Sequence, residues 1–233
     1  MTIDELAKYF PALYHMAEDG SWDSIRRHGL LSTTALLDLF EYSGDVREAI
    51  EARRRPSSVA VTHPIHGKAV IRDQAPISDA ILKRCLTDME PAQWYRSLNA
   101  RVFFWLGARR LHGLLNANLY RARTHTILTL NTYAMVADHA GAVVVSRINS
   151  GATHRGGSPR GSETFVRLAD YPFRVGRRSE ASIRESLAEL AVDYSVPDVE
   201  RYVTRVDRML GSNHVETIYE RTSIPASPAV SRS

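Results

Sequence analysis

The sequence has little cysteine and no long apolar run, and each shortage excludes a class of protein. The single cysteine, Cys85, has no partner for an internal disulfide and excludes a zinc site built on several cysteines. A chain with one cysteine is typical of a reducing compartment, so we expect a cytoplasmic protein. No apolar run approaches the roughly 20 residues of a membrane helix. The first residues also lack the basic and apolar stretches of a signal peptide, so we expect no membrane contact.

Lysine is scarce although positive charge is not. Lys plus Arg total 30 against 26 Asp plus Glu, and three of the 30 are lysine, which leaves 27 arginines. Arginine suits bidentate contacts to phosphate, but a GC-rich genome also encodes it by default. The net charge of +4 therefore permits a polyanionic partner without requiring one. The 44% of apolar and 24% of charged residues are typical of a globular domain with its own core.

The familiar catalytic motifs are missing. The sequence has no Walker A loop, no GxGxxG after a strand, no HExxH and no GxSxG. Nine histidines are present, but no pair has helical metal-ligand spacing in a convincing context, since His63 and His66 flank Pro64 and would lie in a turn. We therefore expect no metal site.

Hydrophobic periodicity predicts strands and helices along the whole chain. Strands are expected over residues 13–16, 59–62, 102–106, 126–130, 142–145, 187–192 and 202–206. Helices are expected over residues 21–29, 34–42, 46–54, 91–98 and 111–118, with a further short helix opening at 195–198. The Ser- and Pro-rich residues 222–233 predict a flexible tail. The Gly- and Arg-rich segment 149–178 fits either a solvated loop or a loop that faces a substrate.

Three polar residues lie within or beside apolar strand segments: His15, Arg109 and Glu189. Each has a plain structural interpretation. His15 fits a hydrogen-bonded core histidine and Arg109 fits a salt-bridge partner. Glu189 would face solvent by simple alternation, which avoids the cost of a buried charge.

The order and surroundings of these residues resemble a known family. Residues 14–30 (YHM…SIRRHGL) resemble the opening of the ADP-ribosyltransferase superfamily, in which a strand ending in histidine precedes a helix. Residues 102–109 (VFFWLGAR) are similar to the strand of DarT-type DNA ADP-ribosyltransferases that ends in arginine. Residues 187–197 (LAELAV…VP) are similar to the segment that carries their catalytic glutamate. The chain is thereby identified as a DarT-like bacterial member of the superfamily.

The chain also departs from the family pattern. Phe103 and Ala108 replace prolines, and Arg110 replaces a serine. The stretch 32–100 between the first two blocks is longer than in the family.

The resemblance implies an α+β fold with a split, mostly antiparallel mixed β core and surrounding helices. It implies one domain over residues 1–221, with a helical insertion at 32–100. The substrate would be NAD, with no metal. Cleavage of its nicotinamide bond passes through an oxocarbenium-like state, as in glycoside hydrolysis. Glu189 would stabilise that state and deprotonate the acceptor, and Arg109 would bind the pyrophosphate or the nicotinamide ribose.

Further site residues follow from the same resemblance. Four residues would bind NAD: His15, Tyr14, Gly29 and Trp105. The segment 149–178 would recognise the acceptor, with single-stranded DNA or RNA as the expected partner. Four arginines of this segment would contact it: Arg155, Arg160, Arg174 and Arg177.

We therefore expect a mono-ADP-ribosyltransferase, of the glycosyltransferase class, that modifies a nucleic-acid base. The alternatives are a protein-directed transferase, an NAD glycohydrolase, an RNA 2′-phosphotransferase and a catalytically inert nucleic-acid or nucleotide-binding domain of the same fold. The sequence leaves open the acceptor, the oligomeric state and whether Glu189 faces a cleft.

Overall fold

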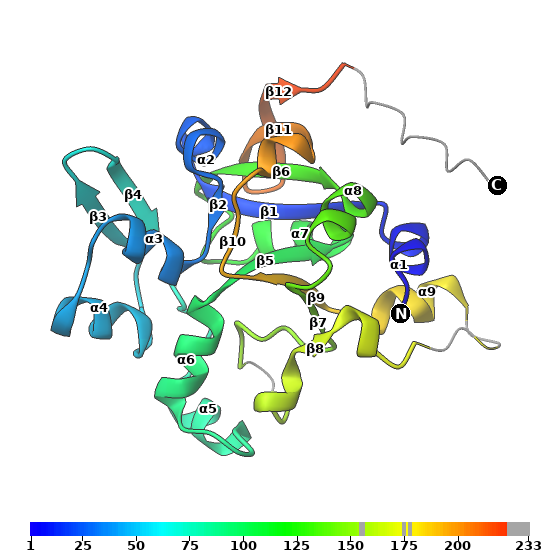
Figure 1. Ribbon diagram of the computed structural model, residues 1–233, viewed down its shortest axis with the longest axis horizontal. Coiled ribbons are helices and arrows are strands. Elements are labelled where there is room, and N and C mark those ends of the chain that lie inside the picture. The colour runs from blue at the N-terminus through cyan, green and yellow to red at the C-terminus, as the bar shows by residue number, and fades with distance from the viewer. Residues whose placement is uncertain (154–156, 174–175, 177–178, 223–233) are drawn as a thin grey trace.

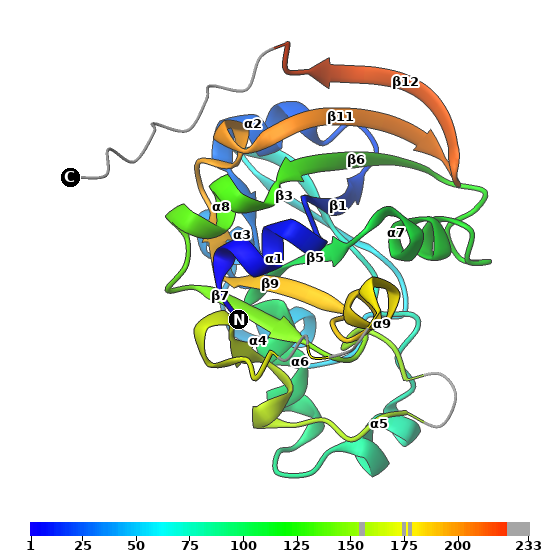
Figure 2. The same cartoon turned by 90° about the vertical axis from the view of Figure 1, so that its right-hand side faces the viewer.

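A computed structural model describes residues 1–153, 157–173, 176 and 179–222, and its main feature is one eight-stranded sheet (Figure 1). The strand order is β12-β11-β6-β1-β5-β9-β7-β8, and every strand pair in it is antiparallel. The strands are β1 (Ala12–Glu18), β5 (Arg101–Leu106), β6 (Thr124–Asn131), β7 (Val143–Ser146), β8 (Val166–Arg167), β9 (Glu189–Asp193), β11 (Val203–Leu210) and β12 (Asn213–Glu220). Figure 2 shows them stacked from β12 at the top to β7 below. The expected α+β class with a mostly antiparallel sheet is confirmed.

The sheet opens between its two central strands. β1 pairs with β6 along its whole length, but it pairs with β5 only at Leu13 and Tyr14. Beyond Tyr14 the two strands separate. A hydrogen bond of 2.9 Å between His15 Nδ1 and the Phe103 carbonyl oxygen joins them at the point of separation.

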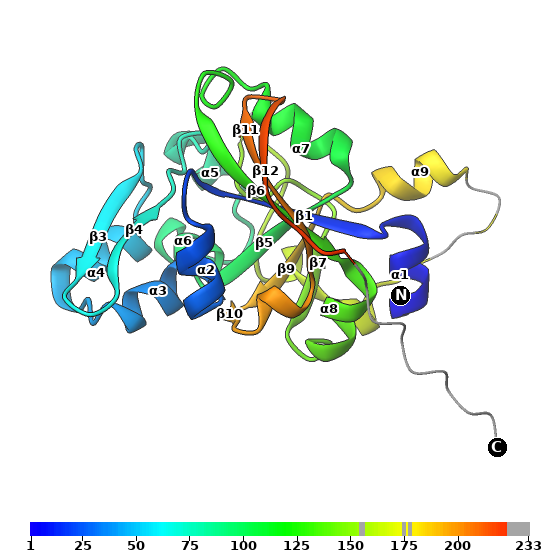
Figure 3. The same cartoon turned by 90° about the horizontal axis from the view of Figure 1, so that it is seen from above.

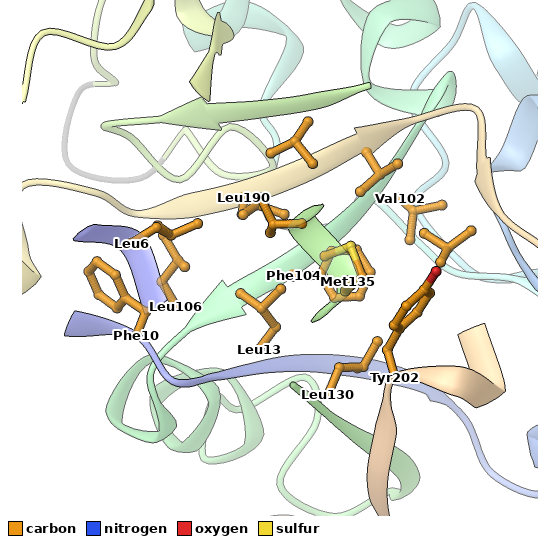
Figure 4. Close-up of a cluster of buried hydrophobic side chains, with 14 of the residues drawn as sticks. Leu6, Phe10, Leu13, Val102, Phe104, Leu106, Leu130, Met135, Leu190 and Tyr202 are labelled. Carbon is orange, nitrogen blue, oxygen red and sulfur yellow. The ribbon is translucent and has the colours of Figure 1, made fainter. Parts of the chain in front are cut away.

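Helices cover both faces of the sheet. One face packs against α1 (Ile3–Tyr9) and α8 (Thr132–Asp138). Figure 4 shows the apolar side chains that meet there, among them Leu6, Leu13 and Met135. Each such buried side chain contributes about 1.5–3 kcal/mol to folding. On the other face, α7 (Ala108–Leu115) places Leu111 and Leu115 against the sheet.

Residues 32–100 form a lobe beside the sheet. Its elements are α3 (Thr33–Leu39), α4 (Gly44–Glu51), β3 (Val59–His63), β4 (Gly67–Ile71), α5 (Asp79–Cys85) and α6 (Pro91–Asn99). The β3–β4 hairpin packs with α3 and α4 through a small apolar cluster of its own. Figures 1 and 3 both show this hairpin at the opposite end of the molecule from α9 (Glu180–Glu185). The insertion is therefore not purely helical. Only its first strand was predicted, because the GKAVI sequence of β4 has no period-two pattern.

The remaining elements are α2 (Trp22–His28), β2 (Leu30–Leu31), β10 (Ser195–Val196) and the 3-10 helices η1 (Ser162–Thr164), η2 (Leu168–Asp170) and η3 (Val199–Arg201). The prediction that a short helix begins at residue 195 is wrong. β10 pairs with β2 instead, and only η3 is helical there. Pro197 explains this, because the residue before a proline disfavours helical backbone angles.

Helix α1 was not predicted, although the sequence carries its start signal. Thr2 and Glu5 form a reciprocal capping box at its N-terminus. The predicted flexible tail lies outside the described residues, apart from Thr222. In the described part of the chain, every helix is too short or too polar to cross a membrane.

Candidate active site

Glu189 is a buried carboxylate at the start of β9. Its neighbours in register are Trp105 on β5 and Ser146 on β7, and Trp105 in turn lies opposite Tyr14 on β1. These four side chains therefore form one row across one face of the sheet. Glu189 is 4% exposed, so the expectation from alternation that it faces solvent is wrong. Strand β9 lies between β5 and β7, and its first four residues, which point to both faces of the sheet, are all buried.

Ser150 holds this carboxylate from the segment after β7. Its backbone N–H and its hydroxyl both donate to Glu189 Oε2, at 3.1 and 2.7 Å. Burial raises the pKa of Glu189 to about 7, against the opposing effects of the Ser150 hydrogen bonds and of Arg160 and Arg110. A carboxyl group with this pKa can gain or lose a proton near neutral pH, as a general acid or base requires.

Arg160 fixes Ser150 in place. Its Nη1 donates to the Ser150 carbonyl oxygen at 3.1 Å, and its guanidinium lies 5.7 Å from the centre of the Trp94 ring. The side chain is buried, whereas the sequence predicted an arginine facing the acceptor. The difference arises because the Arg160 backbone pairs with the chain around Leu86. The other predicted loop arginines (Arg155, Arg174 and Arg177) lie outside the described residues.

Arg109 is not brought to Glu189. Gly107, at φ +93°, ends the β5 segment and turns the chain into α7, so Arg109 lies in the first helical turn. Its side chain is 80% exposed and forms an ion pair with Glu185. The next residue, Arg110, is less exposed, and its charge helps to lower the pKa of Glu189. Arg110 is therefore the better candidate for the arginine of this site.

His15 lies where β1 and β5 separate. Burial lowers its pKa to about 4, so the imidazole is neutral at pH 7. Since Nδ1 bonds a carbonyl oxygen, Nδ1 carries the proton and Nε2 is an acceptor. Tyr14 and Trp105 are half-buried and pack beneath α7.

Gly29 has a packing role that explains why it is glycine. It ends α2 with φ +80°, and a Cβ at this position would lie 2.5 Å from the Cα atom of Pro197. Pro197 follows the opposite end of β9 from Glu189. The structure therefore does not bring Gly29 into the row around Glu189.

A cavity of about 440 Å³ lies beside the row, at the end of β7. Its lining includes Ser146, Arg147, Arg160, Thr164 and Tyr171. Arg147 and Tyr171 contact each other, with the guanidinium 5.2 Å from the ring centre. The cavity thus brings a cation, an aromatic ring and hydroxyl groups together beside Ser146, the residue of β7 that lies in register with Glu189.

Sequence reasoning missed Ser150 and Arg110. Ser150 is one serine in a polar, glycine-rich segment, and no local pattern distinguishes it. The described residues contain no cluster of three or more His, Cys, Asp or Glu side chains that could hold a metal ion.

One comparison with known proteins gives a family. The family of unknown function DUF7002 matches residues 11–203. No curated protein matches the chain. The family match covers β1, β5, β7 and β9, and so includes the whole row around Glu189.

Proposed function

Because the chain belongs to the DUF7002 family of unknown function, its site is the guide to its chemistry, and we propose that it is a mono-ADP-ribosyltransferase that uses NAD. One observation carries the proposal. Glu189 is a buried carboxylate whose pKa is raised to about 7, and it lies in register with Tyr14 and Trp105 on a sheet that opens at His15. This arrangement agrees with the split core that the resemblance implies, with His15 and Glu189 on strands either side of β5.

The proposed reaction uses Glu189 in its ionised form. The bond between the ribose C1′ atom and the nicotinamide nitrogen breaks, and nicotinamide leaves as a neutral molecule. The carboxylate stabilises the positive charge that develops on the ribose. A bond forms between C1′ and a nucleophilic atom of the acceptor, whose proton passes to Glu189.

Other residues have supporting roles in this proposal. Ser150 orients the carboxylate, and Arg110 replaces Arg109 as the guanidinium that binds the pyrophosphate or the nicotinamide ribose. His15 follows Tyr14 and lies opposite Leu128, so its side chain is on the other face of the sheet from Glu189, and its role is to join β1 to β5 through the Nδ1 hydrogen bond.

The acceptor that we propose is an unpaired nucleic-acid base. The cavity beside Ser146 supports this choice, because the exposed Arg147 guanidinium, which covers the buried Tyr171 ring, offers a planar cation to a base. Bases of single strands stack on such groups in many binding proteins.

The test is nicotinamide release from NAD by the purified protein, alone and with single-stranded DNA or RNA. Glu189→Gln is the inactive variant, and Arg109→Gln is a matched surface control. We expect release that one nucleic acid stimulates and that falls at least about 100-fold in Glu189→Gln, because fixed electrostatic groups commonly contribute about 3 kcal/mol to a transition state.

Other outcomes favour other functions. Release that no nucleic acid or protein stimulates would favour an NAD glycohydrolase. No release, combined with no rise in melting temperature on adding NAD, would exclude the transferase and favour an inert binding domain. Removal of a 2′-phosphate from RNA in the presence of NAD would identify an RNA 2′-phosphotransferase.

A further inference from the structure

The cavity at the end of β7 is lined by two arginines, Arg147 and Arg160, that form no ion pair with any described residue. Its volume of about 440 Å³ lies within the range of about 300–1,000 Å³ that is typical of ligand pockets. The contacts of the two guanidinium groups within the described part of the chain are all to neutral groups. These are the hydroxyl and ring of Tyr171, two backbone carbonyl oxygens and the Trp94 ring.

Arg160 is a buried cation with one nitrogen to spare. The residue is 3% exposed, and a buried charge without a counter-ion is costly. Its Nε donates to the Ser158 carbonyl oxygen and its Nη1 to that of Ser150, both at 3.1 Å. Nη2 donates to no described residue and, unlike Trp94 Nε1, is not sealed from solvent. Because Arg160 lines the cavity, a ligand there has access to this nitrogen.

Arg147 offers a second guanidinium at the same cavity. Its side chain is exposed, and its Nε donates to the Tyr171 hydroxyl at 3.1 Å. That bond, together with the 5.2 Å contact between the guanidinium and the ring, fixes the orientation of the group. Both Nη atoms lack a hydrogen-bond partner among the residues that the structure describes, so they remain for a ligand.

The charge of the lining favours an anion. Two guanidinium groups are opposed by one carboxylate, that of Glu163, which is exposed. Guanidinium N–H groups form strong, directional bonds to the oxygens of phosphate. The tetrahedral oxygens of a phosphate can also accept from two guanidinium groups that do not share a plane.

We propose that this cavity binds a phosphate group through Arg147 and Arg160. Phosphate oxygens accept from Arg160 Nη2 and from the Nη atoms of Arg147, and the phosphate supplies the counter-charge that buried Arg160 lacks. The face of the Arg147 guanidinium turned away from Tyr171 stays available to a base. That the phosphate belongs to the acceptor nucleotide rests on the proposed function, whereas phosphate binding itself does not.

The experiment compares thymidine 5′-monophosphate with thymidine by titration calorimetry on the full chain in a phosphate-free buffer. The two ligands share the sugar and the base and differ in the phosphate. We expect the monophosphate to bind at least about tenfold more tightly, because charge-assisted hydrogen bonds form only with its phosphate.

A third ligand identifies the source of the phosphate. In thymidylyl-(3′→5′)-thymidine the phosphate is a bridging diester and both ends are free of phosphate. An affinity close to that of the monophosphate would support the site and assign it to the backbone of a strand. An affinity close to that of thymidine would support it as a site for a phosphorylated strand end.

Substitutions locate the phosphate in this cavity. Arg147→Gln should reduce the preference for the monophosphate about tenfold, and Arg160→Lys should reduce it as well, because lysine keeps the charge without the planar N–H pair. Glu163→Gln should strengthen monophosphate binding about threefold by removing the opposing charge. Arg26→Gln is the matched control, since it removes the same charge from a side chain of α2 that is 51% exposed, and it should change the preference less than about twofold.

Several results would overturn the inference. Equal affinity for thymidine and its monophosphate in the unmodified protein would do so without any variant. Acetate that displaces the monophosphate as well as inorganic phosphate does would show that the cavity does not select phosphate. An equal loss of preference in Arg26→Gln and Arg147→Gln would assign it to net charge, and unchanged binding in Glu163→Gln would place the phosphate elsewhere.

The two proposals fail in different ways. Phosphate-dependent binding without nicotinamide release would uphold this site and exclude the transferase. Nicotinamide release without a preference for the monophosphate would uphold the transferase and exclude this site.

Discussion

At the scale of single residues, Glu189 and Ser150 act together, because a hydrogen bond to a carboxylate favours its ionised form. Burial alone would place the Glu189 pKa higher than about 7, and the two bonds from Ser150 oppose it. A base must be ionised to accept a proton. The rate of nicotinamide release should therefore rise with pH and level off above about pH 7.

Ser150→Ala should move this pH profile upward. The variant loses the 2.7 Å bond from the hydroxyl and keeps the 3.1 Å bond from the backbone N–H. Loss of one charge-assisted bond raises the pKa of Glu189 by about one unit, at about 1.4 kcal/mol per unit. The measurement is kcat/KM between pH 5.5 and 9. A midpoint that stays in place would show that Ser150 does not tune the carboxyl group.

The neighbours Arg109 and Arg110 differ in where their side chains lie, so their substitutions should differ in effect. The Arg109 side chain is 80% exposed, while that of Arg110 is 24% exposed and acts on Glu189 electrostatically. Arg110→Gln should lower kcat/KM about tenfold, as expected for loss of a bond to a charged group. Arg109→Gln should change it less than about twofold. Similar losses in both variants would contradict the assignment of Arg110.

At the scale of elements, the turn after α2 depends on a glycine that no other residue can replace. Gly29 has φ +80°, and a Cβ there would meet the backbone of Pro197 at 2.5 Å. The β2–β10 pair, which holds this corner to the sheet, begins one residue later. Gly29→Ala should therefore lower the free energy of unfolding by about 3 kcal/mol or more.

Gly113→Ala in α7 is the matched control. A Cβ at Gly113 meets no atom within 4 Å, and the residue is helical. Alanine is the better helix former, so this change should stabilise the protein by about 1 kcal/mol. Urea unfolding of both variants measures the difference. A small effect at Gly29 would mean that the turn relaxes away from Pro197.

At the scale of the whole molecule, the free energy of unfolding depends on pH through Glu189 and His15. Burial raises the pKa of Glu189 and lowers the pKa of His15, so the two groups change the stability in opposite directions as the pH rises. Glu189 has a folded pKa of about 7 against an ordinary value of 4.5, so the folded protein holds its proton more tightly and loses stability as the pH rises from 4.5 towards 7. His15 has a folded pKa of about 4 against 6.5, so its contribution is lost as the pH falls from 6.5 towards 4. The two trends offset each other in the unmodified protein.

Glu189→Gln should remove one of these trends. At pH 8 the variant should be more stable than the unmodified protein by about 3 kcal/mol, and at pH 5 the two should differ by less than about 1 kcal/mol. The unfolding free energy at the two pH values is the measurement. A difference that does not change with pH would show that Glu189 is ionised in the folded protein throughout this range.

The sequence by itself determined most of the local elements. The apolar run of β5, the proline that opens α6 and the glycine that ends α2 are signals carried by neighbouring residues, and each element forms where these signals place it. The α+β class was what the resemblance of three short segments to a known family implied. Such features are predictable because backbone preference and apolar period depend on residues close together in the chain.

Only the tertiary structure decided the site. Glu189 is buried because other segments cover β9, although its alternation favours solvent. Ser150 donates to Glu189 although the two residues are 39 positions apart in the sequence. The choice between Arg109 and Arg110 depends on how α7 begins after Gly107. Burial, hydrogen-bond partners and pKa values depend on what packs around a side chain, and no local pattern in the sequence encodes those neighbours.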